Sequence, residues 1–150
     1  MKFSTRTLYG LRAILVLASR FGEGSLSVSQ IAKKEGISVP YLEQILNNLK
    51  KKGLVKSVRG PQGGYVLAKK PVEISLEKLF YTLLDKEVPG WGKSAINTDT
   101  DEITLANFLF WKKFKSSLED QLKAVSLKDL IDEARRLKKR KPHTSYAFNI

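Results

Sequence analysis

Cysteine is absent from this chain of 150 residues, and histidine occurs once, as His143. Without cysteine the chain forms no disulfide, no thiolate zinc site and no cysteine-held iron–sulfur cluster, and it offers no thiol nucleophile. A single histidine also excludes a metal site or a catalytic centre built from several imidazoles. We therefore expect neither a metal nor a cofactor, and we expect His143 to be a solvated tail residue.

Long apolar runs are missing as well. No stretch approaches the roughly 18 apolar residues that a membrane-spanning helix needs. The nearest candidate for a signal peptide, residues 13–18, is too short and is followed closely by Arg20. The sequence therefore predicts a cytoplasmic protein that has no membrane partner.

Acidic side chains are scarce in the first half of the chain. Residues 1–70 contain 13 basic and 3 acidic side chains, whereas residues 71–150 contain 14 and 12. The net charge of +12 is therefore concentrated in the first half. This distribution predicts a module that binds a polyanion, joined to a second part. Charge alone does not distinguish nucleic acid from an anionic membrane or an acidic protein.

Helical spacing of apolar residues predicts a first helix that opens after Ser4 or Thr5 and closes at Gly22. Its apolar stripe consists of Leu8, Leu11, Ile14, Leu15, Ala18 and Phe21. A second, short helix is predicted after Ser27, which stands three residues before Gln30 in a capping-box pattern.

Gly36 is expected to stop the second helix, and a third helix is expected over 38–53 with Pro40 in its first turn. The apolar face of the third helix consists of Leu42, Ile45, Leu46 and Leu49. Two helices joined by a short glycine turn are typical of a helix-turn-helix. Two β-prone stretches follow, at 54–58 and 65–67, around a segment rich in glycine and proline. This order predicts a winged helix, and the fold class is mainly α with a small β wing.

The second half is predicted to contain three more helices. Ser75 caps a helix that reaches about residue 84, a polar loop covers 86–102, and Ser126 with Asp129 marks a last helix to about residue 137. Between them, six of the seven residues over 105–111 are apolar. A helix that is apolar on most sides must be covered on several sides, so we expect a partner chain to cover it. The expected dimerisation residues are Leu105, Phe108, Leu109, Trp111, Phe114, Leu118 and Leu122.

These patterns divide the chain into four parts. They are a winged helix-turn-helix domain (1–85), a loop (86–102), a dimerisation helix with the helix that follows it (103–137), and a basic linker with a tail (138–150).

Short blocks of sequence occur in order at 2–6, 9–12, 36–38, 41–44, 53–55, 58–61 and 63–65. In these blocks the chain resembles the Rrf family of bacterial winged-helix regulators, which includes IscR, NsrR and CymR. The resemblance is close over about 1–85 and extends to the remainder by architecture. The resemblance implies a homodimeric transcription factor that binds a roughly palindromic operator in double-stranded DNA. It also implies that the long helix pairs with the same helix of the second subunit.

One departure from the family concerns iron. Iron–sulfur members carry three cysteines in the loop before the dimerisation helix, whereas this loop has none, and Thr98, Thr104 and Asn107 are poor iron ligands. The chain is in this respect similar to the cluster-free member that represses cysteine metabolism. The resemblance therefore implies a repressor of sulfur-assimilation or cysteine genes, and a repressor of the same family that senses a different signal is the alternative.

Candidate DNA-binding residues lie at the start of the third helix, off its apolar face: Ser38, Pro40, Tyr41, Glu43 and Gln44. In a helix-turn-helix these positions face the major groove. Gln44 suits adenine and Glu43 suits cytosine N4, while the hydroxyls of Ser38 and Tyr41 suit phosphate. The alternative is an ordinary solvated helix face.

The predicted wing tip, Arg59, Gly60, Pro61 and Gln62, is typical of a minor-groove probe, because a narrow A·T-rich groove attracts an inserted arginine. A solvated hairpin turn is the alternative. Phosphate contacts are expected from a further set of residues: Lys50, Lys51, Lys2, Ser4, Thr5 and Arg6. For Ser4 and Thr5, helix capping is an equally good explanation.

The apolar C-terminal tail is a candidate for docking on a partner. Proteins that bind O-acetylserine thiol-lyase resemble one another in ending with an isoleucine whose carboxylate enters the enzyme, and Phe148, Asn149 and Ile150 fit that pattern. Packing against the protein's own dimer is the alternative.

Two other functional classes remain to be weighed. A non-regulatory nucleic-acid-binding protein would share the basic first half. An enzyme is not expected, because the sequence offers no Ser/His/Asp set and its glycine-rich segment at 60–64 lies in a predicted hairpin, not between a strand and a helix.

Overall fold

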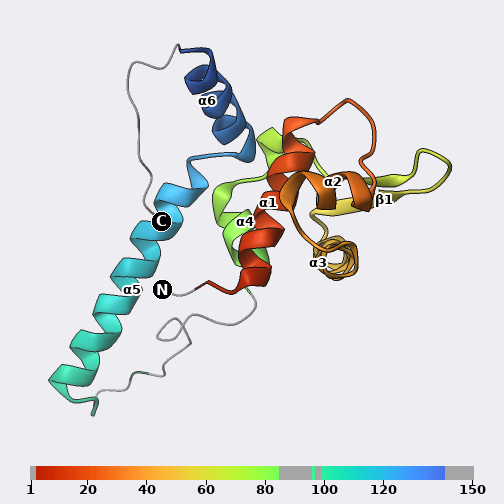
Figure 1. The fold of residues 1–150 in the computed structure, drawn as a ribbon. Coiled ribbons are helices and arrows are strands. Elements are labelled where there is room, and N and C mark those ends of the chain that lie inside the picture. The colour runs from red at the N-terminus through yellow and green to blue at the C-terminus, as the bar shows by residue number, and fades with distance from the viewer. Residues whose placement is uncertain (1–2, 85–95, 97–98, 141–150) are drawn as a thin grey trace.

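The computed structural model describes residues 3–84, 96 and 99–140. Within these residues the elements are α1 (Thr5–Ser19), α2 (Val28–Glu35), α3 (Val39–Lys51), β1 (Val55–Val58), β2 (Gly64–Leu67), the 3-10 turn η1 (Pro71–Glu73), α4 (Leu76–Leu83), α5 (Glu102–Lys123) and α6 (Leu127–Lys139). Figure 1 shows a body formed by α1 to α4 and the hairpin, with α5 extending away from it. The predicted fold class, mainly α with a small two-stranded wing, is confirmed.

Helix starts follow the capping residues that the sequence indicates. The Ser4 side chain caps α1 by accepting a hydrogen bond from the Thr7 backbone N–H at 3.1 Å. Ser27 and Gln30 form the complete capping box of α2. Gly36 then ends α2 in the left-handed conformation, with φ of 65°, which a side chain would disfavour.

The apolar stripe predicted for α1 is partly wrong. The helix ends at Ser19 instead of reaching Gly22, and both Leu8 and Phe21 are exposed. The buried residues of α1 are Gly10, Ala13, Ile14, Val16, Leu17 and Ala18. The physical reason is that α1 is central and contacts α2, α3, α4, α6 and β2, so burial surrounds the helix and does not follow one stripe.

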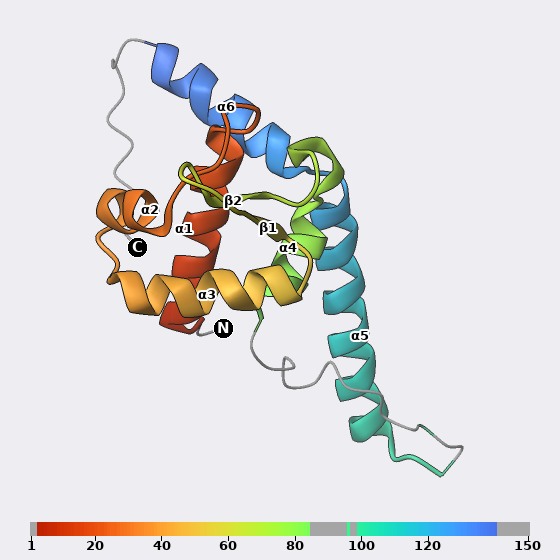
Figure 2. The ribbon, with the colours of Figure 1, turned by 90° about the vertical axis from the view of Figure 1, so that its right-hand side faces the viewer.

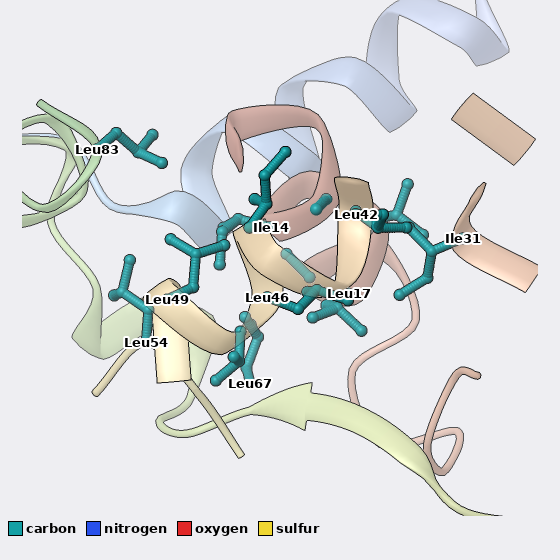
Figure 3. Close-up of a cluster of buried hydrophobic side chains, with 14 of the residues drawn as sticks. Ile14, Leu17, Ile31, Leu42, Leu46, Leu49, Leu54, Leu67 and Leu83 are labelled. Atoms are coloured by element: carbon teal, nitrogen blue, oxygen red, sulfur yellow. The ribbon is translucent and has the colours of Figure 1, made fainter. Parts of the chain in front are cut away.

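The hydrophobic core gathers side chains from most elements of the body. Figure 3 shows this cluster with α1, α2, α3, the hairpin and α4 all contributing. Its labelled members are Ile14, Leu17, Ile31, Leu42, Leu46, Leu49, Leu54, Leu67 and Leu83. The predicted buried face of α3 is confirmed, and its packing fixes which side of α3 faces outward.

The hairpin is antiparallel, with Val55 opposite Leu67 and Ser57 opposite Tyr65. A further bridge pairs Leu26, in the connection between α1 and α2, with Tyr65 of β2. The strand β2 therefore lies between β1 and Leu26. Gly64 permits this close approach, because a Cβ at that position would lie 2.1 Å from the Leu26 carbonyl oxygen.

The start of α6 belongs physically to the core of the body. Ser75 and Ser126 form an isolated antiparallel bridge, in which the Leu76 N–H donates to the Val125 carbonyl at 2.9 Å. The Leu127 N–H donates to the Ile74 carbonyl at 2.8 Å, and the Leu127 side chain is fully buried in the core cluster. The predicted Ser126 cap is confirmed, and α6 extends two residues past the predicted end at 137.

By contrast, α5 contacts the body along one side only. Tyr81 of α4 donates a hydrogen bond to Glu119, and Glu77 forms an ion pair with Lys123 at 3.5 Å. Burial raises the pKa of Tyr81 above its usual value, and the Glu119 hydrogen bond raises it further. Figures 1 and 2 agree that the first half of α5 projects beyond the body. In the part of the chain that the structure describes, no residue of α5 is buried.

Candidate nucleic-acid interface

The outward face of α3 is defined by the four residues Pro40, Gln44, Asn47 and Lys51, all exposed. Their i, i+4, i+7 and i+11 spacing places them on one side of the helix, opposite the buried face. Glu43 is also exposed and flanks this row. Figure 2 shows α3 running along the lower side of the body, with α2 above its N-terminal end.

Ser38 lies at the N-cap position of α3, as predicted, but its hydroxyl makes no capping hydrogen bond within the described residues. Pro40 occupies the first turn, where its missing N–H removes no helical hydrogen bond. Tyr41 is only half exposed, because its ring packs edge-on against Tyr9 of α1 at 6.0 Å between centroids. Ser38 therefore has a hydroxyl that is not used for capping, whereas the ring of Tyr41 packs α3 against α1.

Basic and polar residues at the ends of α1 and α3 are divided between structural and surface roles. Ser4 is the cap of α1, whereas Thr5 and Arg6 are exposed in its first turn. Lys50 and Lys51 are both exposed, and Lys50 also donates a hydrogen bond to Ser57 of β1 at 2.7 Å. Lys2 lies outside the described residues.

The wing tip, Arg59 to Gln62, forms a tight turn between β1 and β2. Gly60 has φ of 115°, a conformation that favours glycine, and its carbonyl accepts from the Gly63 N–H at 2.9 Å. Arg59 and Pro61 are exposed. The Gln62 backbone carbonyl accepts a hydrogen bond from the Ser25 hydroxyl at 2.5 Å. The tip is therefore both exposed and fixed at one side.

Sequence reasoning did not include three residues that the structure places at this interface. Asn47 lies on the outward face of α3, and Tyr65 and Ser25 hold the wing. The spacing of Asn47 from Gln44 is a helical i, i+3 signal that was available in the sequence. The contacts of Tyr65 and Ser25 join distant parts of the chain, so no local pattern indicates them.

A second surface of interest lies on α5. Ile103, Phe110 and Phe114 have exposed fractions of 77%, 59% and 43%, and their i, i+7, i+11 spacing places them on one side of the helix. We call these three residues the apolar face of α5. Phe114 is among the predicted dimerisation residues, whereas Ile103 and Phe110 are not.

The other predicted dimerisation residues fall into two groups. Leu105 and Leu109 are exposed, and the half-buried positions are Phe108, Trp111, Leu118 and Leu122. The rings of Trp111 and Phe114 meet edge-on at 6.1 Å. The predicted partner-binding residues Phe148, Asn149 and Ile150 lie outside the described residues.

An exposed second helix of a helix-turn-helix, followed at once by a projecting basic hairpin, is the architecture of winged-helix DNA-binding proteins. The profile of the Rrf2 family, described as iron-dependent transcriptional regulator, matches residues 3–133. The chain belongs to the Rrf2 family, and the resemblance drawn from its sequence is confirmed.

The chain has similar sequence identity to several different members of the family. It is 36% identical over 130 residues to the HTH-type transcriptional regulator CymR of Bacillus subtilis (strain 168), covering 87% of this chain and 89% of the relative. It is 34% identical over 134 residues to the HTH-type transcriptional regulator IscR of Aliivibrio salmonicida, covering 87% and 77%. The solved structure of T. potens IscR matches with a TM-score of 0.73 and 36% identity, over 95% of each chain.

These relatives are named as transcriptional regulators and not as enzymes, so the chain is a DNA-binding transcriptional regulator. This agrees with the expectation that it is not an enzyme. It also sets aside the alternative of a nucleic-acid-binding protein without a regulatory role. Within the described residues, none of the helices is long and apolar enough to cross a membrane.

The family's description mentions iron, so we asked whether the described residues could hold it. The sequence has no cysteine, and over 3–84, 96 and 99–140 no group of three or more His, Asp or Glu side chains is placed to hold a metal ion. Iron–sulfur clusters are held by cysteine thiolates, and in Rieske centres histidine replaces two of the four. The residues therefore do not fit an iron–sulfur cluster.

Proposed function

We propose that this regulator is a homodimeric repressor without an iron–sulfur cluster, which reads a palindromic operator with α3 in the major groove and the wing in the adjacent minor groove. The observation that carries the proposal is the outward row on α3, where Gln44 is exposed directly opposite the buried face. The net charge of the first 70 residues supplies the sequence-independent attraction to phosphate.

The side chains of α3 divide into base readers and phosphate contacts. A Gln44 carboxamide pairs bidentately with the N6 and N7 of adenine, and a Glu43 carboxylate accepts from the N4 of cytosine. The Ser38 hydroxyl, which no cap employs, suits a phosphate oxygen at the helix N-terminus. Thr5, Arg6 and Lys51 are exposed and add phosphate contacts beside it.

Replacing Gln44 with alanine is expected to relax the preference at one base pair of each half-site by about 1–3 kcal/mol. The loss arises because alanine cannot form the paired hydrogen bonds that distinguish adenine from the other bases. The measurement is binding of the duplex most enriched from a random-sequence pool, compared with its single-base variants, at one fixed salt concentration.

Lys51→Ala is the matched control on the same face of α3. It should weaken binding of all these duplexes alike and lower the slope of log affinity against log salt by about one. If Gln44→Ala lost equal affinity for the enriched and the random duplexes, Gln44 would not read a base.

A second copy of the chain is the proposed occupant of the apolar face of α5. One observation and one consequence of the proposal support it. The helix that carries the face extends away from the body, and its three side chains are 43–77% exposed. The palindromic operator proposed above would also require two equivalent DNA-binding units. The domain division proposed from the sequence then gives a reading unit at 1–85 and a dimerisation unit at 103–137, linked by 86–102 and followed by 138–150.

For the regulated genes, we propose sulfur assimilation or cysteine metabolism. The absence of cysteine, which excludes a thiolate-held cluster, supports this choice; identity alone does not, because it is 36% to CymR and 34–36% to the IscR relatives. The partner implied by the sequence is O-acetylserine thiol-lyase, docking on the segment Phe148, Asn149 and Ile150.

Calorimetric titration with O-acetylserine thiol-lyase tests this part of the proposal. Full-length protein should bind the enzyme, and deletion of Ile150 should abolish binding because it removes the isoleucine of the proposed docking segment. Absence of binding by the full-length protein would refute the partner while leaving the operator-reading role intact.

A further inference from the structure

Two side chains of α3 contact the wing directly. The Tyr65 hydroxyl of β2 donates to Asn47 Oδ1 at 3.2 Å, and Lys50 Nζ donates to the Ser57 hydroxyl of β1 at 2.7 Å. Asn47 and Lys50 are three residues apart and are therefore neighbours on the surface of the helix. Ser57 and Tyr65 are direct cross-strand partners, so their side chains share one side of the hairpin. Two adjacent positions of α3 thus bind two adjacent positions of the wing.

The opposite edge of the wing is held by the connection between α1 and α2. The Tyr65 N–H donates to the Leu26 carbonyl at 2.8 Å, and the Leu26 N–H donates to the Tyr65 carbonyl at 3.1 Å. Ser25 adds its hydrogen bond to Gln62 at the tip. Tyr65 is therefore the residue at which both attachments meet: its backbone binds Leu26 and its hydroxyl binds α3.

The core does not determine the angle of the outer wing. Only Val55 of β1 is buried, and Ser57 and Val58 beyond it are exposed. An isolated two-stranded hairpin is marginally stable in water, so its direction depends on what it contacts. Ser57 precedes Arg59 by two residues, and Asn47 follows Gln44 by one helical turn. The contacts between α3 and the wing are therefore near Gln44, the proposed base reader, on the helix and near Arg59, the proposed minor-groove residue, on the wing.

We propose that the pairs Asn47–Tyr65 and Lys50–Ser57 form a helix–wing clamp, which positions Arg59 at the minor groove relative to α3. In this role Tyr65 and Asn47 are positioning residues that set the preference for the base pairs flanking each half-site. Lys50, which the sequence predicts to be a phosphate contact, uses one of the three N–H donors of its ammonium group in the clamp. The inference rests on the proposed function, because it requires that the wing contacts DNA.

Tyr65→Phe tests the clamp, because it removes one hydroxyl and keeps the ring. The probe is the duplex enriched from a random-sequence pool by the full chain, prepared with either A·T or G·C base pairs flanking the half-sites. The variant should bind the A·T-flanked duplex about fivefold more weakly, the effect of losing one hydrogen bond, and should bind the G·C-flanked duplex like the parent protein. Its melting temperature should lie within a few degrees of that of the parent.

The double variant with Arg59→Ala distinguishes positioning from a general structural effect. If the clamp acts through Arg59, Tyr65→Phe should cause no further loss of affinity once Arg59 is absent. Ser57→Ala tests the second pair in the same way. Tyr81→Phe is the matched control, since it also removes a hydrogen-bonded hydroxyl but on α4, and its effect should not depend on the flanks.

The outcomes separate the two proposals. If Arg59→Ala causes no flank-dependent loss, the proposed wing contact itself is wrong, and the clamp has nothing to position. If Arg59→Ala causes that loss, the wing contact stands. The clamp is then refuted if Tyr65→Phe leaves affinity unchanged, lowers affinity for both duplexes equally, or lowers affinity further in the Arg59→Ala background.

Discussion

Replacing Leu127 with alanine is expected to lower the free energy of unfolding by about 2–5 kcal/mol, although the residue lies far along the chain from the winged helix. The Leu127 side chain is 0% exposed and belongs to the same core cluster as α1 and α3. The bridge between Ser75 and Ser126 fixes its backbone, so the chain at this position cannot shift inward to close the cavity that alanine leaves.

Urea unfolding followed by circular dichroism measures this change, with Leu137→Ala as the matched control. Leu137 is on the same helix but is 55% exposed, so its replacement should change the free energy of unfolding by less than about 0.5 kcal/mol. Equal effects of the two substitutions would mean that α6 does not anchor in the core.

Replacing both Phe110 and Phe114 with glutamine is expected to convert the proposed dimer into a monomer and to reduce operator affinity by about 10²–10⁴-fold. Both rings are exposed in the single chain, so the loss concerns the second copy and not the fold. Glutamine introduces no charge, so the attraction to DNA phosphate stays constant. Two linked half-sites gain affinity only while the two reading units are joined.

Sedimentation analysis and operator titration together test this prediction. Ser116→Gln is the control, because Ser116 is an exposed neutral position of α5 that points away from the apolar face. The control should remain dimeric with unchanged affinity. A double variant that stayed dimeric with a normal melting temperature would place the dimer contact elsewhere.

Local chemistry made most element boundaries predictable. The capping hydroxyls at Ser27, Ser75 and Ser126 and the left-handed Gly36 act within a few residues of chain, so the sequence reports them directly. The outward face of α3 was predictable for the same reason, since four apolar residues at helical spacing define the buried side.

Features that depend on distant contacts were not predictable in this way. The burial pattern of α1 departs from a single stripe because five elements surround it. The bridge between Leu26 and Tyr65 and the core position of Leu127 join segments that no short window contains. The same holds for the hydrogen bonds of Asn47 and Ser25 to the wing.

The bridge between Ser75 and Ser126 has a consequence for how this family can vary. The chain leaves the body after α4 and re-enters it at α6, and hydrogen bonds between Leu76 and Val125 and between Ile74 and Leu127 join the start of α4 to the start of α6. Closing a longer excursion costs little, about 0.6 kcal/mol for each doubling of its length. The excursion can therefore be lengthened, shortened or exchanged between relatives as one cassette, while the DNA-reading body folds around an unchanged junction.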